Sequence, residues 1–150
     1  MAEKKTQPDF IIKCDGGSRG NPGPSALGVV ICTEDGSTLH EYGEFLGQGT
    51  NNEAEYKAVI FGLKKLKQLI GKERAGKSQL EVRVDSELLE RQVNGHFKVQ
   101  EPRMQDLFME LWNSKVDFDS VVFKHVYREQ NSQADRLVNQ ALDKELNKLL

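Results

Sequence analysis

The 150-residue sequence has few cysteines, few histidines and no excess of positive charge. Its two cysteines, Cys14 and Cys32, cannot form a four-ligand zinc site, and the three histidines are widely scattered. Both cysteines lie in apolar runs, so we expect buried, reduced thiols. The 21 lysines and arginines are outnumbered by 23 acidic residues, which argues against a strongly basic nucleic-acid-binding protein. Nucleic acid stays open as a partner, because binding follows the local electric field more than the net charge.

The sequence also lacks long apolar runs. No segment approaches the length that crosses a membrane, and the N-terminal MAEKKTQPD has no apolar stretch like that of a signal peptide. We therefore expect a cytoplasmic protein without a membrane partner. The polar residues 1–8 should form a disordered tail. The apolar content of 37% is typical of globular proteins, and residues 9–150 should form one domain.

Three apolar runs near the start of the chain are separated by turn sequences. The runs at 10–15, 26–35 and 38–47 predict strands, and GGSRGNPGP and DGS predict the turns of an antiparallel meander. The later elements follow from apolar periodicity and from capping residues. They are a helix from 50–52 to Gly71, a strand at 79–85, a short helix at 86–95, a helix after Pro102, a strand at 120–127 and a helix beginning at Asn131 or Ser132.

This element order predicts an α/β fold with a five-stranded mixed sheet, in the order 3-2-1-4-5, flanked by helices. A right-handed crossover places the fourth strand beside the first and parallel to it, and the fifth strand extends the same edge. The C-terminal ends of strands 1, 3, 4 and 5 then point toward the edge where α/β sheets usually bind ligands. Four acidic residues reach that edge from four separate segments, namely Asp15, Glu55, Asp85 and Asp135.

A cluster of carboxylates implies a cation. Carboxylates gather only at an electrostatic cost unless a positive charge joins them, and hard divalent cations prefer oxygen ligands. Glu53 competes with Glu55 for the cluster, but residues two apart on a helix point about 200° apart, so only one faces it. Glu55 shares the expected buried stripe with Ala58 and Val59, where a carboxylate most needs a partner. We therefore choose Glu55.

Four carboxylates at one sheet edge suit the hydrolysis of phosphodiesters. Two divalent ions about 4 Å apart can clamp the attacking and the leaving oxygens of an in-line displacement. Magnesium takes few protein ligands and keeps several waters, so carboxylates and a substrate phosphate together satisfy it. Asn21, Thr50, Asn51 and the backbone amides of the glycine-rich turn are candidates for further phosphate contacts.

Five motifs occur in order over nearly the whole chain: DGGSRGNPGP (15–24), TNNEAEY (50–56), VDSELL (84–89), QVNGHFKV (92–99) and NSQAD (131–135). In their order and spacing the chain resembles the type 1 ribonuclease H family, and most of all its archaeal-type subgroup, which lacks a basic, tryptophan-rich protrusion. The resemblance implies a ribonuclease H-like fold and an endoribonuclease that cuts the RNA strand of RNA–DNA hybrids. It also implies two magnesium ions, with manganese as an alternative, and products with 5′-phosphate and 3′-hydroxyl ends.

The same resemblance implies roles for individual residues. The expected metal ligands and catalytic residues are Asp15, Glu55, Asp85 and Asp135. The expected substrate contacts are Gly16, Ser18, Asn21, Thr50, Asn51, Asn52, Ser86 and Asn131. Contacts to 2′-hydroxyl groups tell RNA from DNA at such a site. We expect a monomer that binds an RNA–DNA hybrid, with double-stranded RNA as a second candidate partner.

Two features depart from the family pattern. Members often carry a mobile histidine before the last acid; here His125 falls inside an expected strand, and Arg128 in the following loop is our preferred candidate. The short segment NGHFKVQEPRMQD stands where the protrusion would be. Hybrid affinity could then depend on the lysine-rich cluster at 64–77, which is otherwise an ordinary solvated helix end.

Two other functions stay open. A catalytically silent hybrid-binding module would keep the fold and lose the activity, although the presence of all four acids argues against it. An integrase-like or resolvase-like nuclease would use the same acids on DNA, although the TNN segment and the glycine-rich turn favour the hybrid.

Overall fold

The computed structural model describes residues 7–148 and contains one five-stranded mixed sheet. Its strands are β1 (Phe10–Ser18), β2 (Gly23–Thr33), β3 (Thr38–Gly49), β4 (Gln79–Val84) and β5 (Ser120–His125). They lie in the order β3-β2-β1-β4-β5, which confirms the predicted topology. The pairs β1–β2 and β2–β3 are antiparallel, whereas β1–β4 and β4–β5 are parallel. Most of the expected tail, residues 1–6, lies outside the described range, as do residues 149–150.

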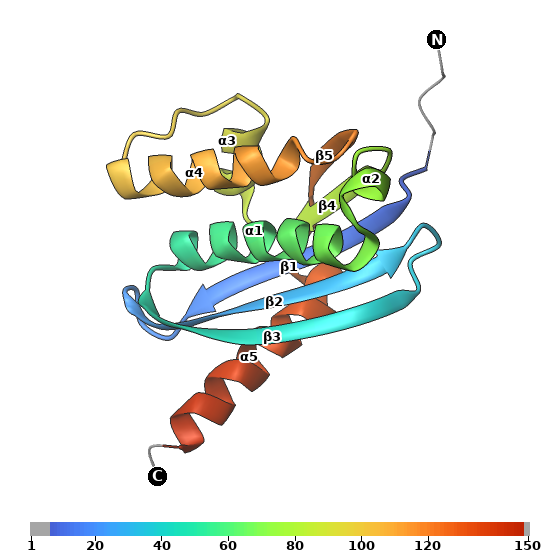
Figure 1. The fold of residues 1–150 in the computed structure, drawn as a ribbon. Helices are drawn as coiled ribbons and strands as arrows, with labels where there is room; N and C mark the ends of the chain where they lie inside the picture. The colour runs from blue at the N-terminus through green and yellow to red at the C-terminus, as the bar shows by residue number, and fades with distance from the viewer. Residues whose placement is uncertain (1–6, 149–150) are drawn as a thin grey trace.

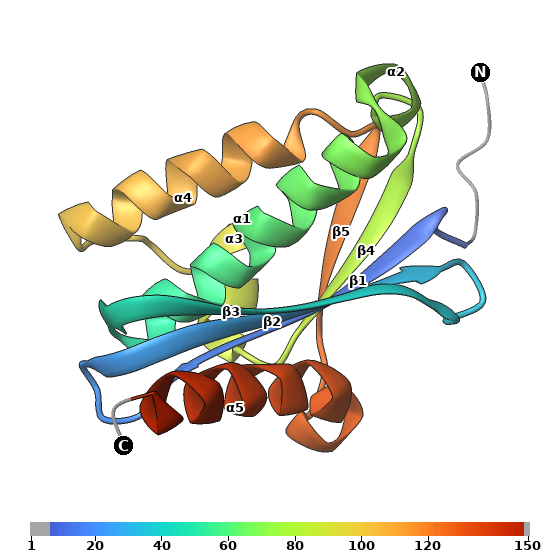
Figure 2. The same cartoon turned by 60° about the horizontal axis from the view of Figure 1, so that its bottom comes forward.

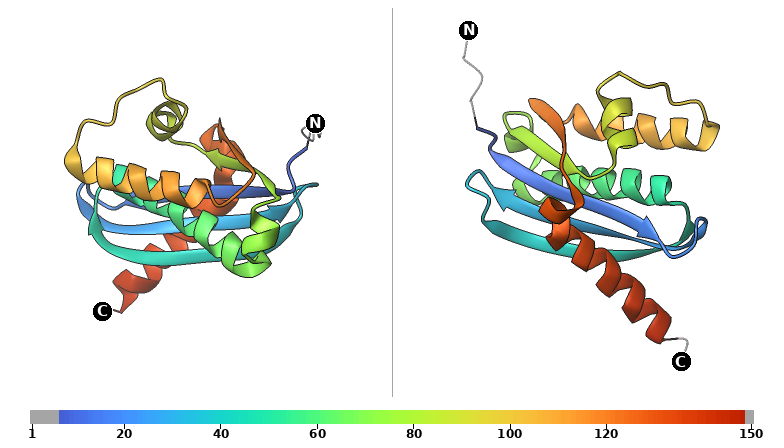
Figure 3. Two further views of the ribbon diagram at one scale, coloured as in Figure 1. Left: turned by 45° about the horizontal axis from the view of Figure 1, so that its top comes forward. Right: turned by 180° about the vertical axis from the view of Figure 1, so that it is seen from behind.

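Helices cover both faces of this sheet. They are α1 (Asn51–Ile70), α2 (Lys72–Ala75), α3 (Glu87–Val93), α4 (Pro102–Lys115) and α5 (Ser132–Asn147), with a 3-10 turn, η1 (Arg128–Asn131). Helix α1 lies on one face with α4 outside it, and α5 lies on the other face (Figures 1 and 2). After β5, the edge strand, the chain crosses to the other face of the sheet to reach α5 (Figure 3). The pattern of the sequence did not predict α2 or η1.

The main hydrophobic core fills the space between α1 and the sheet. Ile12, Leu27, Leu63 and Val82 are each almost fully buried there. A smaller cluster, which includes Cys32 and Leu137, lies under α5. This three-layer arrangement of helix on sheet on helix follows from strands that are apolar on both faces.

The two cysteines are free and buried, as predicted. In the β1–β2 register Cys14 lies opposite Val29 and Cys32 lies opposite Ile11, so the two thiols are not paired across the hairpin. Burial raises the pKa of both thiols. Both side chains therefore act as small apolar groups of the core.

Two large apolar side chains on helices are partly exposed to solvent. Leu69 in the last turn of α1 is 44% exposed, and Trp112 on α4 is 42% exposed. Helix α4 packs on α1 rather than on the sheet, so its buried stripe is narrow and includes Met104 and Leu111. The Lys115 amine lies 4.3 Å from the centroid of the Trp112 ring and covers part of it. Within residues 7–148, no helix is both long and apolar enough to cross a lipid bilayer.

Two glycines let helix N-termini approach the sheet closely. A Cβ atom on Gly16 of β1 would lie 2.2 Å from the carbonyl carbon of Ala54, and one on Gly28 of β2 would lie 2.1 Å from the carbonyl oxygen of Ala134. No side chain fits in either gap. The first contact seats the start of α1 on β1, and the second seats the start of α5 on β2.

We expect Gly16→Ala to destabilise the fold, because the new methyl group would overlap backbone that cannot move independently. Overpacking of this kind costs about 1–3 kcal/mol. Gly17→Ala is the matched control, since its Cβ would meet its nearest neighbour, Val138, at an ordinary 3.7 Å. Chemical unfolding of both variants measures the difference, and equal stability of the two would contradict the close packing at Gly16.

Candidate active site

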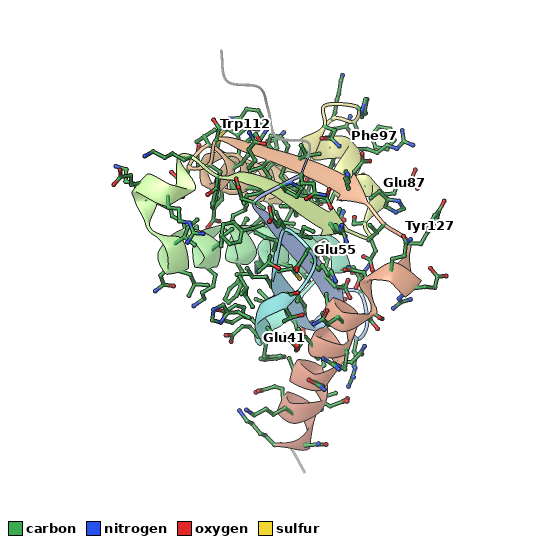
Figure 4. The ribbon with its side chains drawn as sticks, turned by 90° about the vertical axis from the view of Figure 1, so that its right-hand side faces the viewer. Glu41, Glu55, Glu87, Phe97, Trp112 and Tyr127 are labelled. Carbon is green, nitrogen blue, oxygen red and sulfur yellow. The ribbon has the colours of Figure 1, made fainter. Side chains whose placement is uncertain are left out.

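A cavity of about 440 Å³ opens at the C-terminal edge of the sheet. The four predicted acids all line it, together with Arg128. Its other lining residues are Gly16, Gly17, Ser18, Arg19, Asn51, Val138, Asn139 and Leu142. Figure 4 shows Glu55 in the middle of the molecule and Tyr127 at its outer rim.

Each acid is held by a different element. Asp15 lies within β1 and is 8% exposed. Asp85 directly follows β4, so the parallel pairing of β1 and β4 brings these two together. Glu55 lies near the start of α1, and Asp135 lies in the first turn of α5. The four segments that the topology argument gathers from the sequence thus meet at one cavity.

The burial argument used to choose between Glu53 and Glu55 is wrong. Glu53 is the more buried of the two, with 8% exposure. It forms a capping box at the start of α1: the Glu53 backbone N–H donates to the Thr50 hydroxyl at 3.1 Å, and the Glu53 carboxylate accepts from the Thr50 backbone N–H at 3.4 Å. Arg103 adds an ion pair at 3.4 Å. The carboxylate of Glu53 is thus held by Thr50 and Arg103, and Glu55 is the residue that lines the cavity.

The acids raise one another's proton affinity. Burial, followed by the charges of Asp85 and Asp135, raises the pKa of Asp15 to about 8. Burial also raises the pKa of Glu55 to about 7, against a hydrogen bond from Ser86. Asp85 has a raised pKa mainly through burial, opposed by its hydrogen bond with Asp15. The cavity therefore has a strongly negative potential that a cation would relieve.

The donor set fits a hard divalent cation. Every acidic donor is a carboxylate oxygen, which magnesium and manganese accept. Within residues 7–148, no group of three or more acidic, histidine or cysteine side chains is arranged so that it could hold a metal ion. The charges of Asp85, Asp135 and Glu55 nevertheless act on Asp15 and help to raise its pKa. The Asn131 Oδ1 atom beside them is buried and has no protein partner in the described part of the chain.

The predicted substrate residues on the glycine-rich turn form a small network with the start of α1. The Ser18 backbone N–H donates to the Asn51 side-chain oxygen at 2.8 Å, and the Ser18 hydroxyl lies 3.1 Å from the same atom. The Asn51 backbone N–H donates to the Asn21 side-chain oxygen at 3.1 Å. These bonds fix the turn beside the cavity, with Asn21 and Asn51 exposed.

Other predicted substrate residues have structural partners. The Thr50 hydroxyl caps α1, and the Ser86 hydroxyl caps α3 by accepting from the Leu89 N–H at 3.1 Å. Asn131 is fully buried and donates to the Cys14 carbonyl at 2.8 Å, which ties η1 to β1. Asn52 is half-buried.

The two candidates for the mobile catalytic role lie in different places. His125 is exposed at the end of β5, where its ring packs edge-on against Tyr127 at 5.7 Å, and it does not line the cavity. Arg128 does line it, with its Nη2 atom 3.7 Å from the Asp135 Oδ1 atom. This placement agrees with the preference for Arg128.

The lysine-rich cluster at 64–77 has acidic partners. Lys64 pairs with Glu110 at 2.7 Å, and Lys67 pairs with Asp117 at 3.1 Å. The cluster also begins nine residues beyond Glu55, and at about 1.5 Å per residue it lies toward the far end of α1. These positions favour a solvated helix end over a phosphate-binding patch.

Sequence reasoning missed the residues of the cavity wall on α5 and in the turn. Arg19, Val138, Asn139 and Leu142 line the cavity and were not candidates. Asn139 lies four residues after Asp135, and residues at this spacing share one face of a helix. The sequence could therefore have predicted that Asn139 lies beside Asp135.

Comparisons with known proteins agree with this geometry. The sequence model of a family described as reverse transcriptase-like matches residues 13–141. Ribonuclease HI of Halobacterium salinarum is 38% identical over 129 residues, which are 86% of this chain and 62% of that protein. The bifunctional protein Rv2228c of Mycobacterium tuberculosis is 39% identical over 134 residues, which are 89% of this chain and 35% of that protein. The chain thus spans less than two thirds of the length of these relatives.

Solved structures give the same result. The crystal structure of LC11-RNase H1 in complex with an RNA/DNA hybrid superposes with a TM-score of 0.86 and 45% identity, covering 91% of this chain and 99% of that chain. RNase H1 of the archaeon Halobacterium salinarum superposes with a TM-score of 0.83 and 36% identity, covering 90% and 98%. The fold is that of a ribonuclease H-like α/β domain. The chain belongs to the type 1 ribonuclease H family.

The raised pKa values predict how stability depends on pH when a chelator removes divalent cations. The pKa of Asp15 is about 8 in the folded state, against about 3.9 for an unfolded aspartate. Protonation therefore favours the folded state: this contribution is complete below about pH 4 and is lost as the pH rises through about 8. Glu55, with a pKa of about 7, acts in the same direction.

We expect the free energy of unfolding in chelator to fall between about pH 5 and about pH 9. Asp15→Asn should flatten this dependence and stabilise the protein at the alkaline end, because one buried charge is removed. Chemical unfolding at several pH values measures both. A wild-type stability that rises over this interval would contradict the clustering of the acids.

Proposed function

We propose that this domain is an endoribonuclease that hydrolyses the RNA strand of RNA–DNA hybrids with two magnesium ions, leaving 5′-phosphate and 3′-hydroxyl ends. The observation that carries the proposal is the convergence of Asp15, Glu55, Asp85 and Asp135 on one cavity. Support comes from relatives named ribonuclease H and from the similar LC11-RNase H1, which was solved with an RNA/DNA hybrid.

In this proposal the four carboxylates hold the ions, and manganese can replace magnesium because both accept oxygen ligands. When bound, the ions supply Lewis-acid stabilisation of the phosphate and lower the pKa of the attacking water. Asp15 is central, since the charges of Asp85, Asp135 and Glu55 all act on its carboxyl group. The guanidinium group of Arg128 lies beside Asp135, where it would stabilise the negative charge that develops on the phosphate.

The hybrid would lie across the cavity mouth, in contact with the turn and the start of α1. Ser18, Asn21 and Asn51 provide backbone and side-chain groups at this rim. Such groups can bind phosphates and 2′-hydroxyl groups, and the 2′-hydroxyl distinguishes an RNA strand from a DNA strand. Double-stranded RNA stays a second candidate substrate, and we propose that the domain acts as a monomer.

The central experiment compares cleavage of a labelled RNA–DNA hybrid with cleavage of matched RNA and DNA duplexes in magnesium. We expect only the RNA strand of the hybrid to be cut. Asp15→Asn and Asp85→Asn should each slow cleavage by on the order of a thousandfold, because several kcal/mol of charge stabilisation are lost. Hybrid binding, measured by fluorescence anisotropy, should persist in both variants.

Asp106→Asn is the matched control, because it neutralises an exposed aspartate on α4 that does not line the cavity. It should cleave like the wild type. Tight hybrid binding by a wild type that cuts no duplex would indicate a silent binding module, and cleavage of the DNA duplex would indicate the integrase-like alternative. Full activity of Asp85→Asn would overturn the metal assignment.

A second comparison separates the two candidates for the mobile role. Arg128→Ala should slow turnover more than His125→Ala, because only Arg128 lines the cavity. Single-turnover cleavage at saturating enzyme measures this step without the influence of hybrid binding. The reverse order of the two effects would assign the role to His125.

A further inference from the structure

A chain of polar contacts connects the glycine-rich turn to Asp135. The Arg19 Nη2 atom lies 2.7 Å from the Asp143 Oδ1 atom and 3.5 Å from the Asn139 Oδ1 atom. The Asn139 Nδ2 atom in turn donates to the Asp135 Oδ2 atom at 3.4 Å and to the Asp135 backbone carbonyl at 3.1 Å. Two residues of α5, Asn139 and Asp143, and one residue of the turn, Arg19, are therefore connected to the Asp135 carboxylate.

The polarity of this chain is fixed by chemistry. An asparagine amide has an acceptor oxygen on one side and a donor nitrogen on the other, and an arginine guanidinium can only donate. Arg19 therefore holds the oxygen of Asn139 toward itself, which directs the amide nitrogen toward Asp135. The opposite orientation would place two acceptors against each other on the Asp135 side and a donor against Arg19.

The two oxygens of Asp135 thus have different partners. Arg128 lies 3.7 Å from Oδ1, whereas Asn139 lies 3.4 Å from Oδ2. Asp135 lies in the first turn of α5 with its side chain 32% exposed, so packing alone does not hold its carboxylate in one orientation. Hydrogen bonds from the surrounding side chains supply that orientation.

We propose that Arg19 and Asn139 are positioning residues that set the orientation of the Asp135 carboxylate and thereby the affinity of the site for divalent cations. Arg19 acts through Asn139, and Asp143 anchors Arg19. Partners of metal-binding carboxylates typically contribute about ten- to a hundredfold to metal affinity. The inference rests on the proposed metal site, and it assigns Arg19 a role other than direct contact with the substrate.

The test is a titration of the protein with manganese ions in the absence of nucleic acid, in which electron paramagnetic resonance measures the free ion. We expect Arg19→Ala and Asn139→Ala each to weaken manganese binding by about tenfold. Arg19→Lys should restore part of the affinity, because lysine retains a cationic donor. The double variant should bind no more weakly than Asn139→Ala alone, since Arg19 acts through Asn139.

Arg136→Ala is the matched control. Arg136 also ties α5 to the sheet, through an ion pair with Glu41 at 3.2 Å, and this contact does not involve Asp135. Its manganese affinity should equal that of the wild type, which separates orientation of Asp135 from general docking of α5. Asp143→Ala removes the anchor of Arg19 and provides a second test if either primary variant fails to fold.

Some outcomes would overturn the inference. Unchanged manganese affinity in the Arg19 and Asn139 variants would show that these residues do not set the orientation of the Asp135 carboxylate. Because the wild type would still bind manganese, that result would not contradict the proposed nuclease function. Additive losses in the double variant would show that Arg19 acts independently of Asn139. An Arg19→Ala variant that binds manganese normally and only raises KM for the hybrid would reassign Arg19 to substrate binding. Absence of manganese binding by the wild type would overturn the metal site as well.

Discussion

The mutual repulsion of buried carboxylates is the constraint on which the rest of this structure depends. Asp15, almost fully buried in β1, faces Asp85, Asp135 and Glu55 across one cavity. These carboxyl groups can stay close together if they bind protons or a cation. The pKa of Asp15, raised to about 8, shows how strongly its negative charge is disfavoured without such a partner. We expect the cluster to lower the free energy of unfolding at alkaline pH in the absence of a cation, because its buried charges are then unpaired.

The fold holds these acids close in spite of that repulsion. Gly16 and Gly28 bring the backbones of β1 and β2 against the first turns of α1 and α5, so the positions of Glu55 and Asp135 follow from backbone contacts. Asn131 ties η1 to the carbonyl of Cys14, next to Asp15. These contacts belong to the scaffold, whose hydrophobic core compensates for the electrostatic cost.

The sheet order and the gathering of the acids could be predicted from the sequence, because strand direction and crossover handedness leave few arrangements. The relative burial of Glu53 and Glu55 could not, since it depends on a capping box that satisfies Glu53 locally. The contacts of Arg19 with Asn139 and Asp143 join residues more than a hundred positions apart, and no local pattern encodes them. Trp112 is exposed because α4 packs on another helix, which periodicity alone does not reveal.

The most direct test of the account is an anomalous difference map from crystals grown with manganese and an RNA–DNA hybrid. We predict manganese peaks in contact with the carboxylates of Asp15, Glu55, Asp85 and Asp135, with the two ions about 4 Å apart. The RNA strand should lie over these ions. Ordered hybrid in the map without manganese at these carboxylates would contradict the claim that the cluster is a metal-dependent catalytic centre.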